Sequence, residues 1–249
     1  MSDRRVVIAR IPEGEPRPGD FAVVDAPPPA PLGPGQIRVR TEWLSLDPYV
    51  RALLSGRHFL RMPQPGEVLP AKAVARVVES RHDVWNVGDR LVLETGLQSS
   101  AVSDGADAWR LHPGHVPAST ALGILGVPGM TSYFGLLDVG QLQPGELVLV
   151  SSAAGPVGSM VGQIARLKGA RAIGIAGSRE KCDWVRRGPR LEDCIDYRTE
   201  DVDARLRQLA PEGVNVFFDN TGGALQQLVI GERHLARGAR VVLCGLVTQ

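Results

Sequence analysis

The spacing of hydrophobic and polar positions changes at about residue 118. Before that point, short β-branched or alternating runs are separated by proline and glycine clusters such as those at 26–34 and 63–66. Runs of this kind are typical of β-strands joined by turns. They predict a small barrel-like domain. Its expected strands cover residues 5–10, 21–25, 36–43, 73–79 and 90–94.

From residue 119 onward, apolar runs alternate with amphipathic ones. The apolar stretch 119–137 is interrupted by Pro128 and Gly129 and by Thr131 and Ser132. These interruptions favour a pair of buried helices over a membrane span. Later apolar runs predict strands over 147–151, 172–176, 194–197, 214–219 and 240–244. The segments between them predict helices over 156–168, 179–187, 202–210 and 223–235. Such alternation is typical of a doubly wound parallel sheet.

We therefore expect an α/β protein with two domains, 1–118 and 119–249. The second domain has five predicted parallel strands, whereas the dinucleotide-binding fold ordinarily has about six. The chain ends five residues after the last predicted strand, at Gln249. We expect this domain to be incomplete at its C-terminus, without the sixth strand.

Composition narrows the class of partner. The chain has 249 residues, of which 43% are hydrophobic and 22% charged, as in ordinary globular proteins. Its formal net charge of +1 does not suggest binding to nucleic acid or an anionic membrane. Three cysteines and an N-terminus without an apolar signal segment fit a reducing compartment. We expect a cytoplasmic protein.

A glycine-rich turn after the strand at 147–151 carries the main chemical signal. Glycines at 155 and 158 would let the backbone approach a pyrophosphate, which the N-terminus of the following helix would attract. Ala153 replaces the first glycine of the usual pattern, and Gly162 would allow close packing of the helix. Because a strand precedes the turn and a helix follows it, the pattern favours a coenzyme site over a plain turn. The candidate binding residues are Ala154, Gly155, Pro156, Val157 and Gly158.

The end of the next strand indicates which dinucleotide binds. Sites for NAD place an acidic residue there to accept hydrogen bonds from the adenosine ribose. Here that position lies at Gly177 and Ser178, and Lys181 follows. Ser178 and Lys181 can donate to a 2′-phosphate, and Tyr197 after the third strand could add its hydroxyl. These residues predict NADPH, although Lys181 could also be an ordinary exposed helix residue.

Several motifs together resemble the medium-chain dehydrogenase/reductase superfamily. The similarity is to its zinc-free branch of prostaglandin reductases, alkenal double-bond reductases and curcumin reductases, and it covers nearly the whole chain. Six pieces in family order carry it: WLSLDPYVR (43–51), VPGMTSYFGL (127–136), AAGPVGSMVGQIA (153–165), DYRTED (196–201), FFDNTGG (217–223) and LCGLVTQ (243–249).

The resemblance implies a GroES-like β-barrel substrate domain followed by a Rossmann domain that binds NADP. It implies a homodimer that transfers a hydride from NADPH to the β-carbon of an α,β-unsaturated ketone or aldehyde. Asn220 would contact the coenzyme, Lys181 and Tyr197 would hold its 2′-phosphate, and Tyr49 would line the substrate pocket. The residues implied beside the nicotinamide are Met130, Thr131, Cys244, Gly245 and Leu246.

The sequence departs from the family pattern in three places. Ala71 and Lys72 stand where glycines are usual, and Ser99 and Ser100 replace aromatic residues. Because of these two changes, the sequence does not indicate which substrate is preferred. The family also continues beyond Gln249 with a tyrosine and a sixth strand, so this chain resembles a C-terminally truncated member.

Two alternatives to an enone reductase remain. One is a quinone reductase on the same scaffold, and the other is a truncated, non-catalytic NADP-binding protein. A zinc alcohol dehydrogenase is disfavoured because the five histidines and three cysteines form no ligand pattern. We therefore expect no metal site.

Overall fold

The computed structural model describes residues 3–56, 60–112, 114, 116–231 and 234–245. The chain divides into two compact units, Met1–Leu122 and Gly123–Gln249. Each unit has hydrophobic clusters of its own.

The N-terminal unit is built on antiparallel strands. A two-stranded sheet pairs β1 (Arg4–Ile8) with β2 (Phe21–Asp25), and the 3₁₀ turn η1 (Pro18–Asp20) precedes β2. A five-stranded sheet has the order β6-β3-β4-β5-β7. Its strands are β3 (Ile37–Leu44), β4 (Lys72–Ser80), β5 (Arg90–Glu94), β6 (Ser100–Ser103) and β7 (Trp109–Arg110). Antiparallel strands therefore form this unit, as expected of the GroES-like domain, and β6 and β7 lie outside the predicted strands.

The residues of β4 and β5 alternate between two apolar clusters. Ala75, Val77 and Leu91 pack in one, whereas Val74 and Val92 pack in the other. The second cluster also receives Ala121 from the 3₁₀ turn η2 (Ala118–Leu122). A short helix, α1 (Tyr49–Leu54), follows β3.

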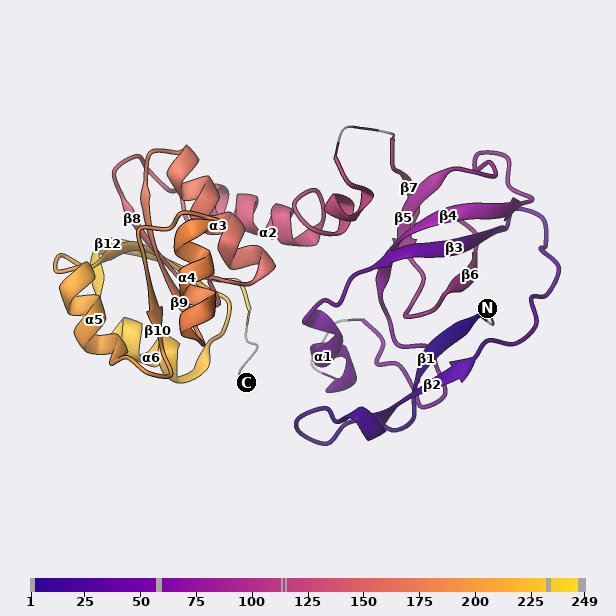
Figure 1. The fold of residues 1–249 in the computed structure, drawn as a ribbon, viewed down its shortest axis with the longest axis horizontal. Coiled ribbons are helices and arrows are strands. Elements are labelled where there is room, and N and C mark those ends of the chain that lie inside the picture. The colour runs from indigo at the N-terminus through magenta and orange to yellow at the C-terminus, as the bar shows by residue number, and fades with distance from the viewer. Residues whose placement is uncertain (1–2, 57–59, 113, 115, 232–233, 246–249) are drawn as a thin grey trace. The chain divides into compact units, whose positions relative to one another are not determined.

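The C-terminal unit contains a sheet of five parallel strands in the order β10-β9-β8-β11-β12 (Figure 1). Its strands are β8 (Leu147–Val150), β9 (Arg171–Ala176), β10 (Asp193–Asp196), β11 (Val214–Asp219) and β12 (Leu235–Leu243). Numbered within the unit, this is the 3-2-1-4-5 order of a Rossmann fold. The doubly wound parallel sheet predicted from the alternation of strands and helices is confirmed.

Helices cover both faces of this sheet. The helices after β8 and β9 are α3 (Pro156–Leu167) and α4 (Arg179–Arg187), and those before and after β11 are α5 (Val202–Leu209) and α6 (Gly223–Gly231). Val148 and Val150 of β8 pack in the cluster that contains residues of α3 and α4. Leu147 and Leu149 pack in the cluster that contains residues of α5 and α6. This strand is therefore apolar on both faces, which explains its continuous apolar run in the sequence.

The helix boundaries follow local chemistry. Pro156 occupies the first turn of α3, where its missing N–H costs no helical hydrogen bond. The Ser178 hydroxyl caps α4 by accepting a hydrogen bond from the Lys181 backbone N–H at 3.2 Å. Asp201 caps α5 in the same way, through the Ala204 N–H.

The helices predicted over 119–137 are present, but they cover only part of the stretch and are only partly buried. After η2, only α2 (Val127–Phe134) and the π-helical turn η3 (Gly135–Val139) are helical. Leu136 is buried, but Met130, Tyr133 and Phe134 are about half exposed. An apolar stretch shows which residues could be buried, but α2 buries only one face, with Pro128, Gly129 and Ser132, and packs against α3.

The prediction of a helix to residue 235 is wrong, because α6 ends at Gly231 and β12 begins at Leu235. Leu235 pairs with Val214, and the register shifts before Arg240 pairs with Val216. Gly238 has φ +76° in the inserted segment, a conformation that glycine adopts readily. The strand therefore starts before the bulge, whereas the pattern predicted only its second half.

No helix in the described part of the chain is long and apolar enough to span a membrane.

Candidate coenzyme site

The strand order creates a crevice at the carboxyl ends of β8 and β11. These strands are paired neighbours, although the chain leaves β8 toward β9 on the other side. In open α/β sheets, ligands bind outside the carboxyl ends of the strands at such a switch point. The glycine-rich turn follows β8, so the sequence places it at this position.

The turn after β8 brings backbone atoms close together. Ser152 has φ +53°, an uncommon conformation for a residue with a side chain. A Cβ atom on Gly158 would lie 2.4 Å from the Ser152 carbonyl oxygen, so only glycine fits there. Gly155 is the N-cap of α3 and provides no side-chain cap. The first N–H groups of α3 therefore remain available for an anion.

A buried carboxylate organises the adjacent strand end. Asp219, the last residue of β11, is fully buried and accepts a hydrogen bond from the Ser151 hydroxyl at 2.8 Å. It also accepts from the backbone N–H groups of Thr221 and Gly222 and from the Gln226 side chain at 3.0 to 3.1 Å. This network fixes the loop after β11. Asp219 was not among the site residues predicted from the sequence, although it ends a predicted strand and lies in the FFDNTGG motif.

A cavity of about 470 Å³ lies at this crevice. Its lining comes from the turn after β8, the ends of β9 and β10, the first turn of α4, the loop after β11 and the start of α6. The lining residues are Ser152, Ala154, Gly155, Ile175, Ala176, Gly177, Lys181, Tyr197, Arg198, Thr221, Gly222, Ala224 and Leu225. Five of the predicted residues therefore meet in one cavity, and none of its described lining residues is acidic. Pro156, Val157 and Gly158 continue from the lining into α3.

Two cations and an aromatic ring stand at the β9–β10 side of this cavity. A Cβ atom on Gly177 would lie 2.9 Å from the Tyr197 hydroxyl, so the Tyr197 ring packs directly against the Gly177 backbone. The Arg198 guanidinium carbon lies 5.9 Å from the centre of the Tyr197 ring. Lys181 and Arg198 are both exposed and line the cavity. Arg198 was not predicted from the sequence, although it directly follows Tyr197.

Other predicted coenzyme residues lie outside this cavity. Met130 and Thr131 belong to α2, which is tied to α3 by the Ser132 hydroxyl, 3.1 Å from the Val157 carbonyl oxygen. Met130 lines an apolar groove between α2 and α3.

Asn220, Cys244 and Gly245 gather at the ends of β11 and β12. Asn220 is buried and its side-chain amide donates to the Ser151 carbonyl at 2.8 Å. Cys244 and Gly245 donate their backbone N–H groups to the Asp219 carbonyl. Leu246 lies outside the described residues.

Tyr49 lies in the N-terminal unit, at the first turn of α1. Burial raises the pKa of its hydroxyl to about 12, and the negative charges of Glu94 and Asp47 add to this effect. The hydroxyl is therefore protonated throughout the physiological range. It can donate a hydrogen bond to an oxyanion.

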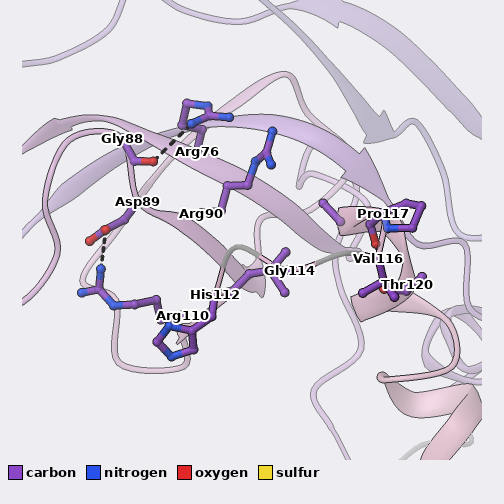
Figure 2. A pocket seen from close by; sticks show the side chains of 12 residues that line it. Arg76, Gly88, Asp89, Arg90, Arg110, His112, Gly114, Val116, Pro117 and Thr120 are labelled. Atoms are coloured by element: carbon purple, nitrogen blue, oxygen red, sulfur yellow. Dashed lines mark hydrogen bonds and ion pairs between the residues drawn. The ribbon is translucent and has the colours of Figure 1, made fainter.

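A second cavity, in the N-terminal unit, contains several arginines (Figure 2). Arg76 and Arg90 are cross-strand partners, and their Nε atoms lie 2.9 and 2.8 Å from the two carboxylate oxygens of Glu42. Arg110 forms an ion pair with Asp89. Two carboxylates thus offset much of the arginine charge, and ordinary ion pairing of a sheet surface accounts for the cluster.

The described side chains provide no metal site. In the part of the chain that the structure describes, no group of three His, Cys, Asp or Glu residues could hold a metal ion. Cys182 and Cys194 contact each other, and Cys244 is on another strand end. The described residues therefore do not fit a zinc centre.

Both units match known protein families. Residues 4–111 match a family described as the N-terminal domain of oxidoreductase, and residues 156–249 match one described as zinc-binding dehydrogenase. The NADPH-dependent curcumin reductase of Escherichia coli (strain K12) is 38% identical over 247 residues, which are 99% of this chain and 71% of that protein. This chain belongs to the medium-chain dehydrogenase/reductase superfamily.

Further relatives place the chain among the reductases of this superfamily. Prostaglandin reductase 1 of Rattus norvegicus is 37% identical over 95% of this chain and 70% of that protein. The crystal structure of CurA in complex with NADPH from Vibrio vulnificus has a TM-score of 0.91 and 38% identity. It is matched by 99% of this chain over 72% of its own length. The resemblance drawn from the six motifs is confirmed.

Proposed function

We propose that this protein binds NADPH at the crevice of its C-terminal unit and reduces the C=C bond of α,β-unsaturated ketones or aldehydes. The observation that carries the coenzyme choice is the cavity without a described acidic residue, in which Lys181 and Arg198 meet the glycine-rich turn. An acid at that position would repel a 2′-phosphate, whereas two cations attract it. The complex of Vibrio vulnificus CurA with NADPH supports the same choice.

The backbone and the cations of the cavity would hold different parts of the coenzyme. The N-terminus of α3 and the close-packed turn at Gly155 and Gly158 would hold the pyrophosphate. Lys181, Arg198 and the Tyr197 hydroxyl would hold the 2′-phosphate, with Ser178 beside them at the start of α4. The remaining proposed neighbours of the coenzyme are Met130, Thr131, Asn220, Cys244, Gly245 and Leu246.

When bound, NADPH supplies the hydride, and the protein has to stabilise the negative charge that develops on the substrate oxygen. Tyr49 is proposed to line the substrate pocket, where its hydroxyl, which keeps its proton below a pKa of about 12, could donate to that oxygen. We propose residues 1–118 as the substrate domain, residues 119–249 as the coenzyme domain, and a homodimer as the assembly. The family resemblance supports these three proposals.

The test is a coenzyme titration followed by a turnover assay. Calorimetry with the purified protein should detect NADPH binding and much weaker NADH binding. Incubation with NADPH and a simple enone should then oxidise the coenzyme and yield the saturated ketone. No NADPH uptake would overturn the coenzyme assignment. Turnover of benzoquinone without turnover of enones or enals would instead favour a quinone reductase.

A further inference from the structure

Two buried cysteines face each other beside the coenzyme cavity. Cys182 lies in α4 and Cys194 in β10, twelve positions apart in the chain. Their sulfur atoms are 2.8 Å apart, and the side chains are 1% and 0% exposed. The Cys194 sulfur also lies close to its paired neighbour Gly174 on β9, where a Cβ atom would be 3.3 Å from it.

We propose that Cys182 and Cys194 form a reversible intrachain disulfide when the protein meets a disulfide oxidant such as oxidised glutathione. The two thiols lose two protons and two electrons as one S–S bond forms. One oxidised glutathione accepts them and becomes two reduced glutathione molecules. From their separation of 2.8 Å, the sulfur atoms must approach by roughly 0.8 Å to reach the usual S–S length of about 2.05 Å.

Burial sets the rate of this reaction. It raises the pKa of both thiols, so the reactive thiolate is scarce in the closed protein. An oxidant must also reach a sulfur atom that solvent does not reach. We therefore expect oxidation during brief opening of the α4–β10 region, followed by closure of the bridge as the two elements repack.

The bridge would join two walls of the coenzyme cavity. Lys181 directly precedes Cys182, and Tyr197 follows Cys194 by three positions. Both residues line the cavity, so a bond between α4 and β10 fixes the spacing of their supporting elements. The proposed modification does not depend on which coenzyme, if any, the cavity binds.

The test is to count free thiols after native oxidation. The full chain is treated with oxidised glutathione at several urea concentrations below its unfolding transition, then denatured and alkylated. We expect the number of alkylated thiols to fall from three to one, with Cys244 remaining free and peptide mapping joining Cys182 to Cys194. The rate should rise with urea, and dithiothreitol should restore all three thiols.

Variants provide matched controls. Cys244→Ser should still form the bridge and lose both remaining thiols, whereas Cys182→Ala and Cys194→Ala should each keep two. Bridged wild-type protein should show a Tm higher by roughly 5 °C, since a short loop is closed in the unfolded chain. The proposal is overturned by three free thiols at every urea concentration, by glutathione adducts in place of a bridge, by pairing with Cys244, or by a lower Tm. The wild-type mapping decides the matter even if an alanine variant does not fold.

Discussion

Replacement of both cations in the cavity tests the coenzyme assignment most directly. In the double variant Lys181→Ala/Arg198→Ala, the 2′-phosphate of NADPH would lose two positive partners, while NADH has no such phosphate. Two unit charges about 4 Å apart attract by ~1 kcal/mol in water and ~4 kcal/mol at a partly shielded protein surface. Because Lys181 and Arg198 are both exposed, we take the lower part of this range.

With ~1 to 1.5 kcal/mol for each cation, the double variant should bind NADPH roughly 30- to 150-fold more weakly. Its NADH affinity should change less than about threefold, because the loss is confined to the phosphate end of the coenzyme. The NADPH affinity of the wild-type protein should also fall as salt rises, and that dependence should flatten in the variant.

The assay is calorimetric titration of both coenzymes at two salt concentrations, with Arg187→Ala as a matched control. Arg187 is an exposed arginine at the end of α4 and does not line the cavity. If the double variant binds NADPH and NADH equally more weakly, or if its NADPH affinity is unchanged, Lys181 and Arg198 do not hold the 2′-phosphate.

Three further predictions concern the turn, the proposed oxyanion donor and an ion pair. Gly158→Ala should weaken coenzyme binding and destabilise the fold by roughly 1–3 kcal/mol in urea unfolding. The reason is that the new Cβ would lie 2.4 Å from the Ser152 carbonyl oxygen. An unchanged unfolding midpoint would contradict this close packing. Tyr49→Phe should lower kcat roughly 100-fold with the NADPH Kd unchanged. The contribution of this hydroxyl to kcat should persist with rising pH until its pKa of about 12 is approached. Equal rates for variant and wild type would exclude Tyr49 as the donor. The Arg240 guanidinium lowers the pKa of Glu146, to which it donates at 2.5 and 2.8 Å. This pair should therefore stabilise the fold fully above the ordinary Glu pKa of 4.5, and its contribution should disappear as pH falls through the lowered native value. Glu146→Gln should cost about 1–2 kcal/mol at neutral pH and much less in acid; an equal cost at both pH values would show that the charge is unimportant.

The parallel sheet and its phosphate turn could be predicted from the amino-acid sequence alone. The helix predicted over 179–187 and the strand predicted over 214–219 match α4 and β11 end to end. The signals for these two elements are local: a capping serine precedes α4, and β11 is rich in valine and phenylalanine. The signal from Gly155 and Gly158 after an apolar strand is also local, because these glycines allow close contact between backbone atoms only a few residues apart in the chain.

The set of distant residues that share the crevice depends on the tertiary fold. Tyr197 and Lys181 were expected near one another, but Arg198 and the hydrogen-bonded Asp219 were not. Their positions depend on the strand order, which pairs β8 with both β9 and β11 and sets three strand ends side by side. The contact between Cys182 and Cys194 depends on the packing of α4 against β10 in the same way.

The hydrophobic pattern of the sequence also did not predict which apolar residues are buried or where a strand is irregular. The apolar stretch at 119–137 offers more hydrophobic surface than α2 covers, so Met130 and Phe134 remain exposed. The early start of β12 depends on pairing between Leu235 and Val214 and on a bulge at Gly238. Periodicity along a chain specifies which side chains can be buried together, whereas the partner that buries them is set by contacts between segments far apart in sequence.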